Sequence, residues 1–193
     1  MNPYHYVEFS KVPGYRAIAR EQGKQIRGIV VVRENDTASQ LSDLEGETLA
    51  FPAPAAFAAT ILVRAELERL GVSYTPKYVS SHDSVYLSVA RGFVKAGGGI
   101  ERTFSSALES GLEGARVLWR SPGYTPHAFA VHPDFSEGDK EKIADLLVSL
   151  SETEEGQGLL GGVTLKALVR ASDSDWDDVR RLGLDFIEAD ETP

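Results

Sequence analysis

The feature that most constrains the fold is an alternation of strand-like and helix-like segments from Ile26 to Trp119. Ile26–Val32 is a continuous β-branched run, typical of a strand buried in a parallel sheet, and Thr48–Phe51 is a shorter one. The segment after the second run ends at Gly71, and its apolar stripe consists of Ala59, Val63, Leu67 and Leu70. Because 42% of the residues are hydrophobic, the chain can bury a substantial core.

The same alternation continues through the rest of this region. Further strands are expected at Tyr74–Val79, Phe93–Ala96 and Val117–Trp119, with helices at Asp83–Arg91 and Thr103–Leu112. Because strands and helices alternate, we predict an α/β fold whose parallel or mixed sheet is covered by helices on both faces.

Beyond residue 120 the pattern is mostly helical. His127–His132 is expected to form one more strand. A later helix opens at Ser136, and its apolar stripe consists of Ile143, Leu146, Leu147 and Leu150. The acidic tail is expected to fray after a short helix around Trp176–Leu182.

Composition and charge exclude several classes of function. The net charge of -9 and the lack of a Lys/Arg cluster argue against a nucleic-acid partner, which needs a basic face. The absence of cysteine removes disulfides, thiolate zinc sites and a cysteine nucleophile together. No apolar run approaches the roughly 20 residues of a membrane span. Nothing in the sequence implies a cofactor.

A Ser81-His82-Asp83 cluster invites a catalytic interpretation, which its spacing does not support. A Ser-His-Asp triad needs three side chains that converge on one proton path, whereas adjacent residues point in diverging directions. A metal site is not expected, because no second histidine lies three or four residues from His82, and His127 and His132 would sit on opposite faces of a strand. No nucleophile has a base within reach, so we predict that the chain is not an enzyme.

The same cluster fits a helix start. Ser80 or Ser81 can act as the N-cap, and Asp83 complements the positive end of the helix. The first-turn N–H groups are then left for a ligand, since such starts lie at the carboxyl ends of strands, where open α/β sheets bind ligands. The alternative is that Ser81 is only a cap and His82 a surface residue, and the local sequence leaves both open.

Two more helix starts are expected at the same sheet edge. Small residues follow the second strand at Pro52–Ala59, where a ligand could approach the backbone closely and Phe57 could pack on it or face the core. Gly97–Gly99 precede Arg102 and Thr103, which suit a phosphate or carboxylate. The three glycines are expected to form either a tight connection or an anion cradle.

Taken in order, the residues resemble the periplasmic phosphate/phosphite/phosphonate-binding proteins of ABC importers. The matching pieces are Asn2-Pro3-Tyr4-His5-Tyr6, Leu44–Phe51, Ser81-His82-Asp83, Val89-Ala90-Arg91-Gly92, Lys95-Ala96-Gly97, Trp119-Arg120-Ser121-Pro122 and Pro126-His127. The resemblance spans nearly the whole chain.

This resemblance implies a periplasmic-binding-protein-like fold of two lobes that closes on a ligand at a hinge of two crossing segments. Residues 37–123 would form a complete second α/β lobe. Residues 1–36 and 124–193 would form an incomplete first lobe, because family members have further strands and helices before the Asn-Pro-Tyr segment. The crossing segments would be Val32–Thr37 and Ser121–Ala128.

Carried over by position, the resemblance also implies a set of binding residues. Tyr6 would face the ligand from the first lobe, and His82 from the second. The helix start that supplies hydroxyl groups in phosphonate binders falls at Ala56, Phe57 and Ala58, which keep only backbone donors. The full expected set is Tyr6, Ala56, Phe57, Ala58, Ser81, His82, Arg102, Thr103 and His127.

The expected function is the solute-binding component of an ABC importer that holds a phosphonate, phosphite, phosphate or related oxyanion between its lobes without chemistry. Two acidic positions that meet an aminophosphonate's ammonium fall near Arg102 and His127, so 2-aminoethylphosphonate is a poor candidate. The alternative is a ligand-sensing domain of a regulator or sensor kinase with the same fold. The expected partners are the small anion and the transporter permease. The expected location is periplasmic or otherwise extracytoplasmic, and a homodimer through an uncovered sheet face is left open.

Overall fold

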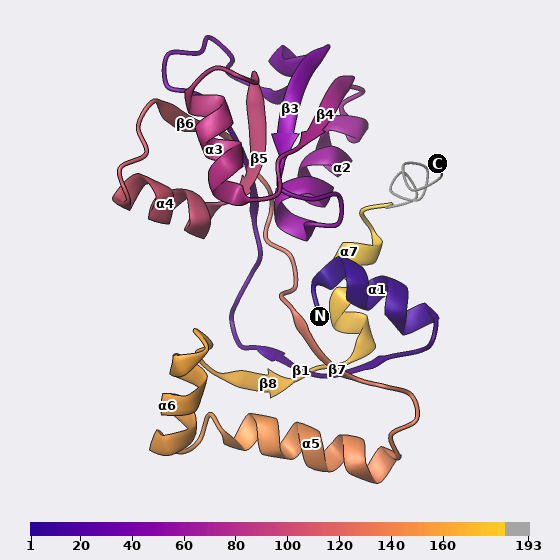
Figure 1. The fold of residues 1–193 in the computed structure, drawn as a ribbon. Helices are drawn as coiled ribbons and strands as arrows, with labels where there is room; N and C mark the ends of the chain where they lie inside the picture. The colour runs from indigo at the N-terminus through magenta and orange to yellow at the C-terminus, as the bar shows by residue number, and fades with distance from the viewer. Residues whose placement is uncertain (184–193) are drawn as a thin grey trace. The chain divides into compact units, whose positions relative to one another are not determined.

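The computed structural model describes residues 1–183, which form two compact units (Figure 1). Unit 1 consists of Met1–Ile26 with Tyr124–Leu182, and Arg27–Gly123 make up the body of unit 2. The chain therefore crosses between the units at residues 26–27 and 123–124. The first crossing lies earlier than the expected boundary at residues 36–37, because the strand in between pairs inside the sheet of unit 2.

Unit 2 is built on a five-stranded mixed sheet of order β4-β3-β5-β2-β6. Strand β3 runs parallel to β4 and β5, whereas β2 runs antiparallel to both of its neighbours, β5 and β6. Its strands are β2 (Gly28–Arg33), β3 (Glu47–Phe51), β4 (Tyr74–Tyr78), β5 (Ala96–Ile100) and β6 (Ala115–Arg120). Its helical segments are η1 (Leu41–Leu44), η2 (Phe57–Ile61), α2 (Leu62–Arg69), α3 (His82–Ala90) and α4 (Glu101–Glu109).

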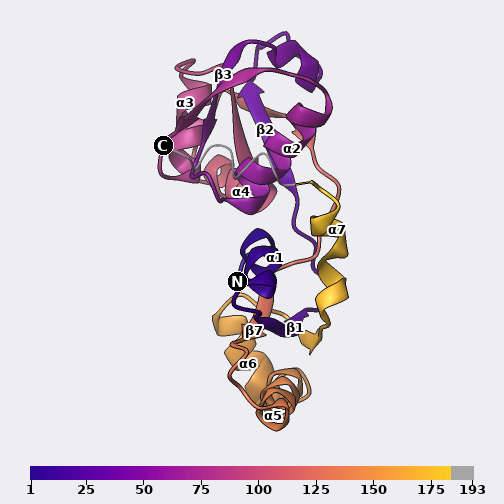
Figure 2. The ribbon, with the colours of Figure 1, turned by 90° about the vertical axis from the view of Figure 1, so that its right-hand side faces the viewer.

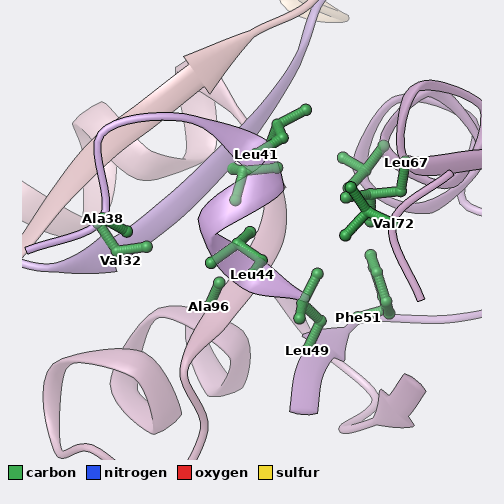
Figure 3. Close-up of a cluster of buried hydrophobic side chains, with 11 residues drawn as sticks. Val32, Ala38, Leu41, Leu44, Leu49, Phe51, Leu67, Val72 and Ala96 are labelled. Atoms are coloured by element: carbon green, nitrogen blue, oxygen red, sulfur yellow. The ribbon is translucent and has the colours of Figure 1, made fainter. Parts of the chain in front are cut away.

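The continuous apolar run in β2 reflects burial on both faces. Val30 and Val32 join one core with Leu49, Phe51 and the helix α2, and Figure 3 shows this cluster. Ile29 and Val31 point the other way, into a second core with side chains of α3 and α4. Because side chains alternate across a strand, a run that is apolar at every position must be covered twice. The predicted helix layers on both faces are confirmed.

The three consecutive glycines were expected in a turn, but they lie inside β5. A Cβ at Gly97 or Gly99 would meet Val85 or Tyr86 of α3. A Cβ at Gly98 would overlap the carbonyl oxygen of Ala59 on the opposite face. The strand therefore begins later than the predicted Phe93–Ala96, and the glycines let helices on both faces approach the sheet.

Unit 1 has a small antiparallel sheet of order β7-β1-β8. Its strands are β1 (Arg16–Glu21), β7 (Ala128–Val131) and β8 (Leu168–Arg170). Its helices are α1 (Pro3–Lys11), α5 (Glu137–Ser149), α6 (Glu154–Gly162), η3 (Asp173–Trp176) and α7 (Asp177–Arg180). Figure 2 shows α5 and α6 beside this sheet. Ile18 and Val131 pack on Ala144 of α5.

Some parts of unit 1 differ from what the sequence predicts. β8 was expected to be helical, but it pairs with β1 at Ala19, Arg20 and Glu21. Leu146 was placed on the packing stripe of α5, and it is 67% exposed. The expected fraying of the tail falls on residues outside the described part of the chain. No helix of residues 1–183 is both long enough and apolar enough to cross a membrane.

Candidate anion-binding site

Three helical segments of unit 2 begin at one edge of its sheet. They follow β3, β4 and β5, which are parallel and therefore end at the same edge (Figure 1). Phe51 pairs with Tyr78 at this edge, and α4 begins directly after Ile100. The first N–H groups of a helix have no acceptor within it, and the helix dipole is positive there. The edge therefore suits an anion.

The start of η2 contains Ala56, Phe57 and Ala58. This segment is a π-helical turn, in which the amide of Ile61 donates to the carbonyl of Ala56 at 3.2 Å. Its backbone lies directly on the sheet, because a Cβ at Gly28 would overlap the carbonyl oxygen of Ala58. Phe57 is 4% exposed and belongs to the core. The side chains of Ala56, Phe57 and Ala58 thus offer no polar group at this start, and the amide of Ala56 already donates to the carbonyl of Ala53 at 3.2 Å.

The start of α3 is capped by Ser81. Its Oγ accepts a hydrogen bond from the amide of Ser84 at 3.1 Å and lies 2.9 Å from Oγ of Ser84. Ser80 precedes it with φ of 69°, a conformation that residues other than glycine rarely adopt. Such strain costs about 1–3 kcal/mol and is common at ligand sites. The predicted N-cap is confirmed, and the Ser81 side chain is exposed.

His82 is the first residue of α3, and its ring stacks on Tyr86 with 6.3 Å between centroids. Nδ1 of His82 is buried and has no hydrogen-bond partner within residues 1–183. Burial lowers the pKa of His82, and the nearby charge of Asp83 opposes this only in part. The imidazole is therefore neutral at pH 7, with one ring nitrogen left unsatisfied in a buried position.

The start of α4 carries Arg102 and Thr103. The Arg102 side chain is exposed, and the neighbouring Glu101 forms an ion pair with Arg120 at 2.9 Å. Thr103 Oγ1 donates to the carbonyl of Ile100 at 2.9 Å and lies 2.6 Å from the hydroxyl of Tyr86. The structure thus connects the start of α4 to His82 through a single side chain of α3, Tyr86.

Two of the expected binding residues, Tyr6 and His127, belong to unit 1. Tyr6 is fully buried, packs on Trp176 with 4.6 Å between ring centroids, and donates its hydroxyl proton to Asp173 at 2.8 Å. His127 is exposed. Desolvation of its ring, followed by the charges of the amino terminus and Lys24, lowers its pKa against the opposing effect of Glu21.

The buried position of Tyr6 leads to a prediction about stability. Burial is the main cause that raises the pKa of Tyr6 from 10.0 to about 12. As the pH rises, the unfolded chain loses this proton before the folded chain does. The hydroxyl's contribution to the stability of the fold is therefore complete below pH 10 and is lost as the pH rises to about 12. Tyr6→Phe should lower the free energy of unfolding by about 1–2 kcal/mol at about pH 8. Between about pH 8 and 12 the variant should lose less stability than wild type does. Urea unfolding at several pH values measures both, and parallel pH profiles for the two proteins would contradict the assignment.

Tyr86 is not among the binding residues expected from the sequence. Its signal was its position four residues after His82, which places both rings on one face of the helix. Tyr86 also borders a hollow of about 390 Å³ between α3 and α4, which is lined by Asp83, Tyr86, Leu87, Ser106, Ala107, Ser110, Gly111 and Leu112. None of the expected binding residues lines this hollow. Within residues 1–183, no three His, Asp or Glu side chains are grouped so that they could hold a metal ion.

Comparison with known protein families identifies the family of this chain. The model of the family described as "ABC transporter, phosphonate, periplasmic substrate-binding protein" matches residues 1–176. The chain belongs to this family. The predicted resemblance is thus confirmed, and the chain is a substrate-binding protein of the phosphonate ABC transporter type and not an enzyme.

Solved structures show the same fold at low sequence identity. PhnD1 from Prochlorococcus marinus, in complex with methylphosphonate, has a TM-score of 0.75 at 16% identity, with 94% of this chain and 75% of that chain covered. The binding-protein component of a phosphonate transporter from Pseudomonas aeruginosa has a TM-score of 0.74 at 15% identity, covering 97% and 67%. The periplasmic aliphatic sulphonate-binding protein SsuA from Escherichia coli has a TM-score of 0.66 at 17% identity, with 94% of this chain and 67% of that chain covered. The predicted periplasmic-binding-protein-like fold class is confirmed.

Membership in the phosphonate-transporter family also determines the general kind of partner and location. Substrate-binding proteins of ABC transporters deliver a small molecule to a permease, and the family implies an extracytoplasmic location. The homodimer left open above remains untested, and light scattering can test it.

Proposed function

We propose that unit 2 binds a phosphonate or a related oxyanion, such as phosphite or phosphate, at the sheet edge where η2, α3 and α4 begin. The ligand would be held by first-turn backbone N–H groups, by His82 and by the charge of Arg102. Because the net charge of the protein is -9, the attraction for an anion has to be local. Binding requires no chemical step, and in this role the protein would act in the periplasm.

The observation that carries this proposal is the buried Nδ1 of His82 at a helix start. A buried polar atom without a hydrogen bond costs about 1–3 kcal/mol. An oxyanion at the first turn of α3 would supply that bond, either as an acceptor or through a protonated oxygen. Because Nδ1 is buried, a partner and not the solvent would have to supply its hydrogen bond.

The site favours oxyanions that carry no amino group. Arg102 is exposed at the start of α4, and a cation there would repel an ammonium group. Ala56, Phe57 and Ala58 offer no side-chain acceptor for an ammonium group. Methylphosphonate, phosphite and phosphate therefore fit better than 2-aminoethylphosphonate.

Thermal unfolding in the presence of anions tests the proposal. A ligand at about 100 times its Kd stabilises by about 2.7 kcal/mol, which is a rise of roughly 5–10 °C in Tm for a protein of this size. We expect this rise with methylphosphonate, phosphite or phosphate, and a much smaller one with 2-aminoethylphosphonate. The proposal is wrong if none of the first three anions shifts the Tm of the wild-type chain.

His82 variants show whether the shift comes from the proposed site. His82→Ala should abolish most of the anion-dependent shift, whereas His82→Asn, whose amide lies near the position of Nδ1, should keep part of it. His132 in unit 1 is partly exposed and pairs with Asp134, so His132→Ala is the matched control. An equal shift in wild type and His82→Ala would place the anion elsewhere.

A further inference from the structure

The hydroxyl of Tyr86 belongs to a closed hydrogen-bond network with Ile100 and Thr103. The amide of Ile100 donates to the Tyr86 hydroxyl at 3.1 Å. The Tyr86 and Thr103 hydroxyls lie 2.6 Å apart, and both are within reach of the Ile100 carbonyl, at 3.2 Å and 2.9 Å. Whichever hydroxyl donates to the other, both protons stay within the network. Thr103 thus has no proton left to offer to an anion.

This network joins the two helix starts. Ile100 is the last residue of β5 and the N-cap of α4, but it has no side chain that can cap the helix. Tyr86 lies in the second turn of α3, and its hydroxyl accepts a hydrogen bond from the amide of Ile100. The fit is close, because a Cβ at Gly99 would overlap the Tyr86 hydroxyl and lie 2.6 Å from its ring carbon Cε1. Glycine at this position is therefore part of the same arrangement.

The ring of Tyr86 also supports the start of α3. It stacks on His82 and meets Phe104 of α4 edge-on, with 5.1 Å between ring centroids. Tyr86 is fully buried, so its contacts on both sides are fixed. One side chain thereby sets the imidazole of α3 and the first turn of α4 relative to each other.

We propose that Tyr86 is the positioning residue of the anion site, and that it holds the starts of α3 and α4 in register through its hydroxyl and its ring. Thr103 then acts as part of this network and not as a ligand donor. The inference rests on the proposed function, since it assigns the residue that keeps the anion donors in place. Preorganised donors bind more tightly because no ordering cost is left to the binding step.

A measurement without ligand tests the positioning alone. In Tyr86→Phe the amide of Ile100 loses its acceptor while the ring stays, so amide hydrogen exchange at Ile100 should accelerate about tenfold or more. Ser88→Ala is the matched control on the same helix, because Ser88 Oγ donates to the carbonyl of Ser84 at 2.6 Å and does not reach α4. Unchanged exchange at Ile100 in Tyr86→Phe would overturn the inference, whatever the anion results are.

Calorimetry with methylphosphonate tests the consequence for binding. At a temperature where all variants are folded, Tyr86→Phe should raise Kd by roughly 5- to 20-fold, as the loss of one buried hydrogen bond would. Thr103→Val should have a similar effect, and the double variant should be no weaker than either single one, because each breaks the same network. Ser88→Ala should change Kd less than about twofold.

The two proposals fail in different ways. If wild type binds methylphosphonate and Tyr86→Phe binds it equally well, the positioning role is wrong and the proposed function stands. If Tyr86→Phe and Thr103→Val weaken binding additively, Thr103 is an independent ligand donor and the network inference is wrong. If wild type binds none of the tested oxyanions, the proposed function fails and the binding role of Tyr86 fails with it.

Discussion

Gly98→Ala is expected to destabilise the protein by at least about 3 kcal/mol, which is a large part of the stability of an ordinary domain. The added Cβ would overlap the carbonyl oxygen of Ala59 and lie 2.8 Å from Cδ1 of Phe51. Neither neighbour can yield, because Ala59 contributes backbone of η2, and Phe51 is fully buried in the sheet. Urea unfolding followed by circular dichroism measures the loss.

The same chemical change at Gly158 is the matched control. Gly158 lies within α6, is exposed, and has no atom within 4 Å of the position a Cβ would take. Alanine in a helix interior is favoured over glycine by about 0.5–1 kcal/mol, so Gly158→Ala should be slightly more stable than wild type. Comparable stabilities of the Gly98→Ala and Gly158→Ala proteins would refute the close packing of η2 on β5.

This packing also explains how the candidate site is placed. Gly28 and Gly98 lie on neighbouring strands and admit the carbonyls of Ala58 and Ala59 directly onto the sheet. On the other face Gly99 admits Tyr86. The starts of η2 and α3 are therefore positioned on the sheet by glycines that leave room for them, and a substitution of these glycines should disturb folding.

The alternating strands and helices of unit 2 were predictable because burial leaves a pattern in the sequence. The run Ile29–Val32 had to be covered on both faces, and the stop at Gly71 has φ of 67°, as a helix end requires. The place of the three glycines was not predictable. A tight turn and a close helix contact both require the absence of Cβ, and the backbone that occupies the space comes from Ala59, far away in the sequence.

The candidate site was predictable in part for the same kind of reason. Ser81 carries a local capping signal, and the structure confirms the cap. Tyr86 carried only its spacing of four residues from His82, and its bond with Ile100 could not be predicted because it joins two elements. Tyr6 shows the converse case, in which a resemblance suggested a ligand contact and the structure places the hydroxyl in a bond with Asp173 inside unit 1.

Ser81→Asp is expected to separate the two interpretations of the Ser-His-Asp cluster, because it changes ligand binding and leaves the helix cap in place. Aspartate is as good an N-cap as serine, and a negative charge at a helix start is favourable. Unit charges about 5 Å apart repel by roughly 3 kcal/mol at an effective dielectric constant of about 20. Methylphosphonate affinity should therefore fall by about 100-fold or more, whereas the Tm without ligand should stay within roughly 2 °C of wild type. Calorimetry and a thermal melt measure the two effects.

Thr153→Asp gives the matched control, since Thr153 caps α6 in the same way and its side chain accepts from the amide of Gly156 at 3.1 Å. It adds the same charge to unit 1, so it reproduces any effect of net charge but none of the local repulsion. Ser81→Ala completes the set, because it removes the cap at a cost of about 1 kcal/mol without adding charge. If Ser81→Asp bound the anion as tightly as Thr153→Asp, Ser81 would be a structural cap only, and the start of α3 would have no part in an anion site.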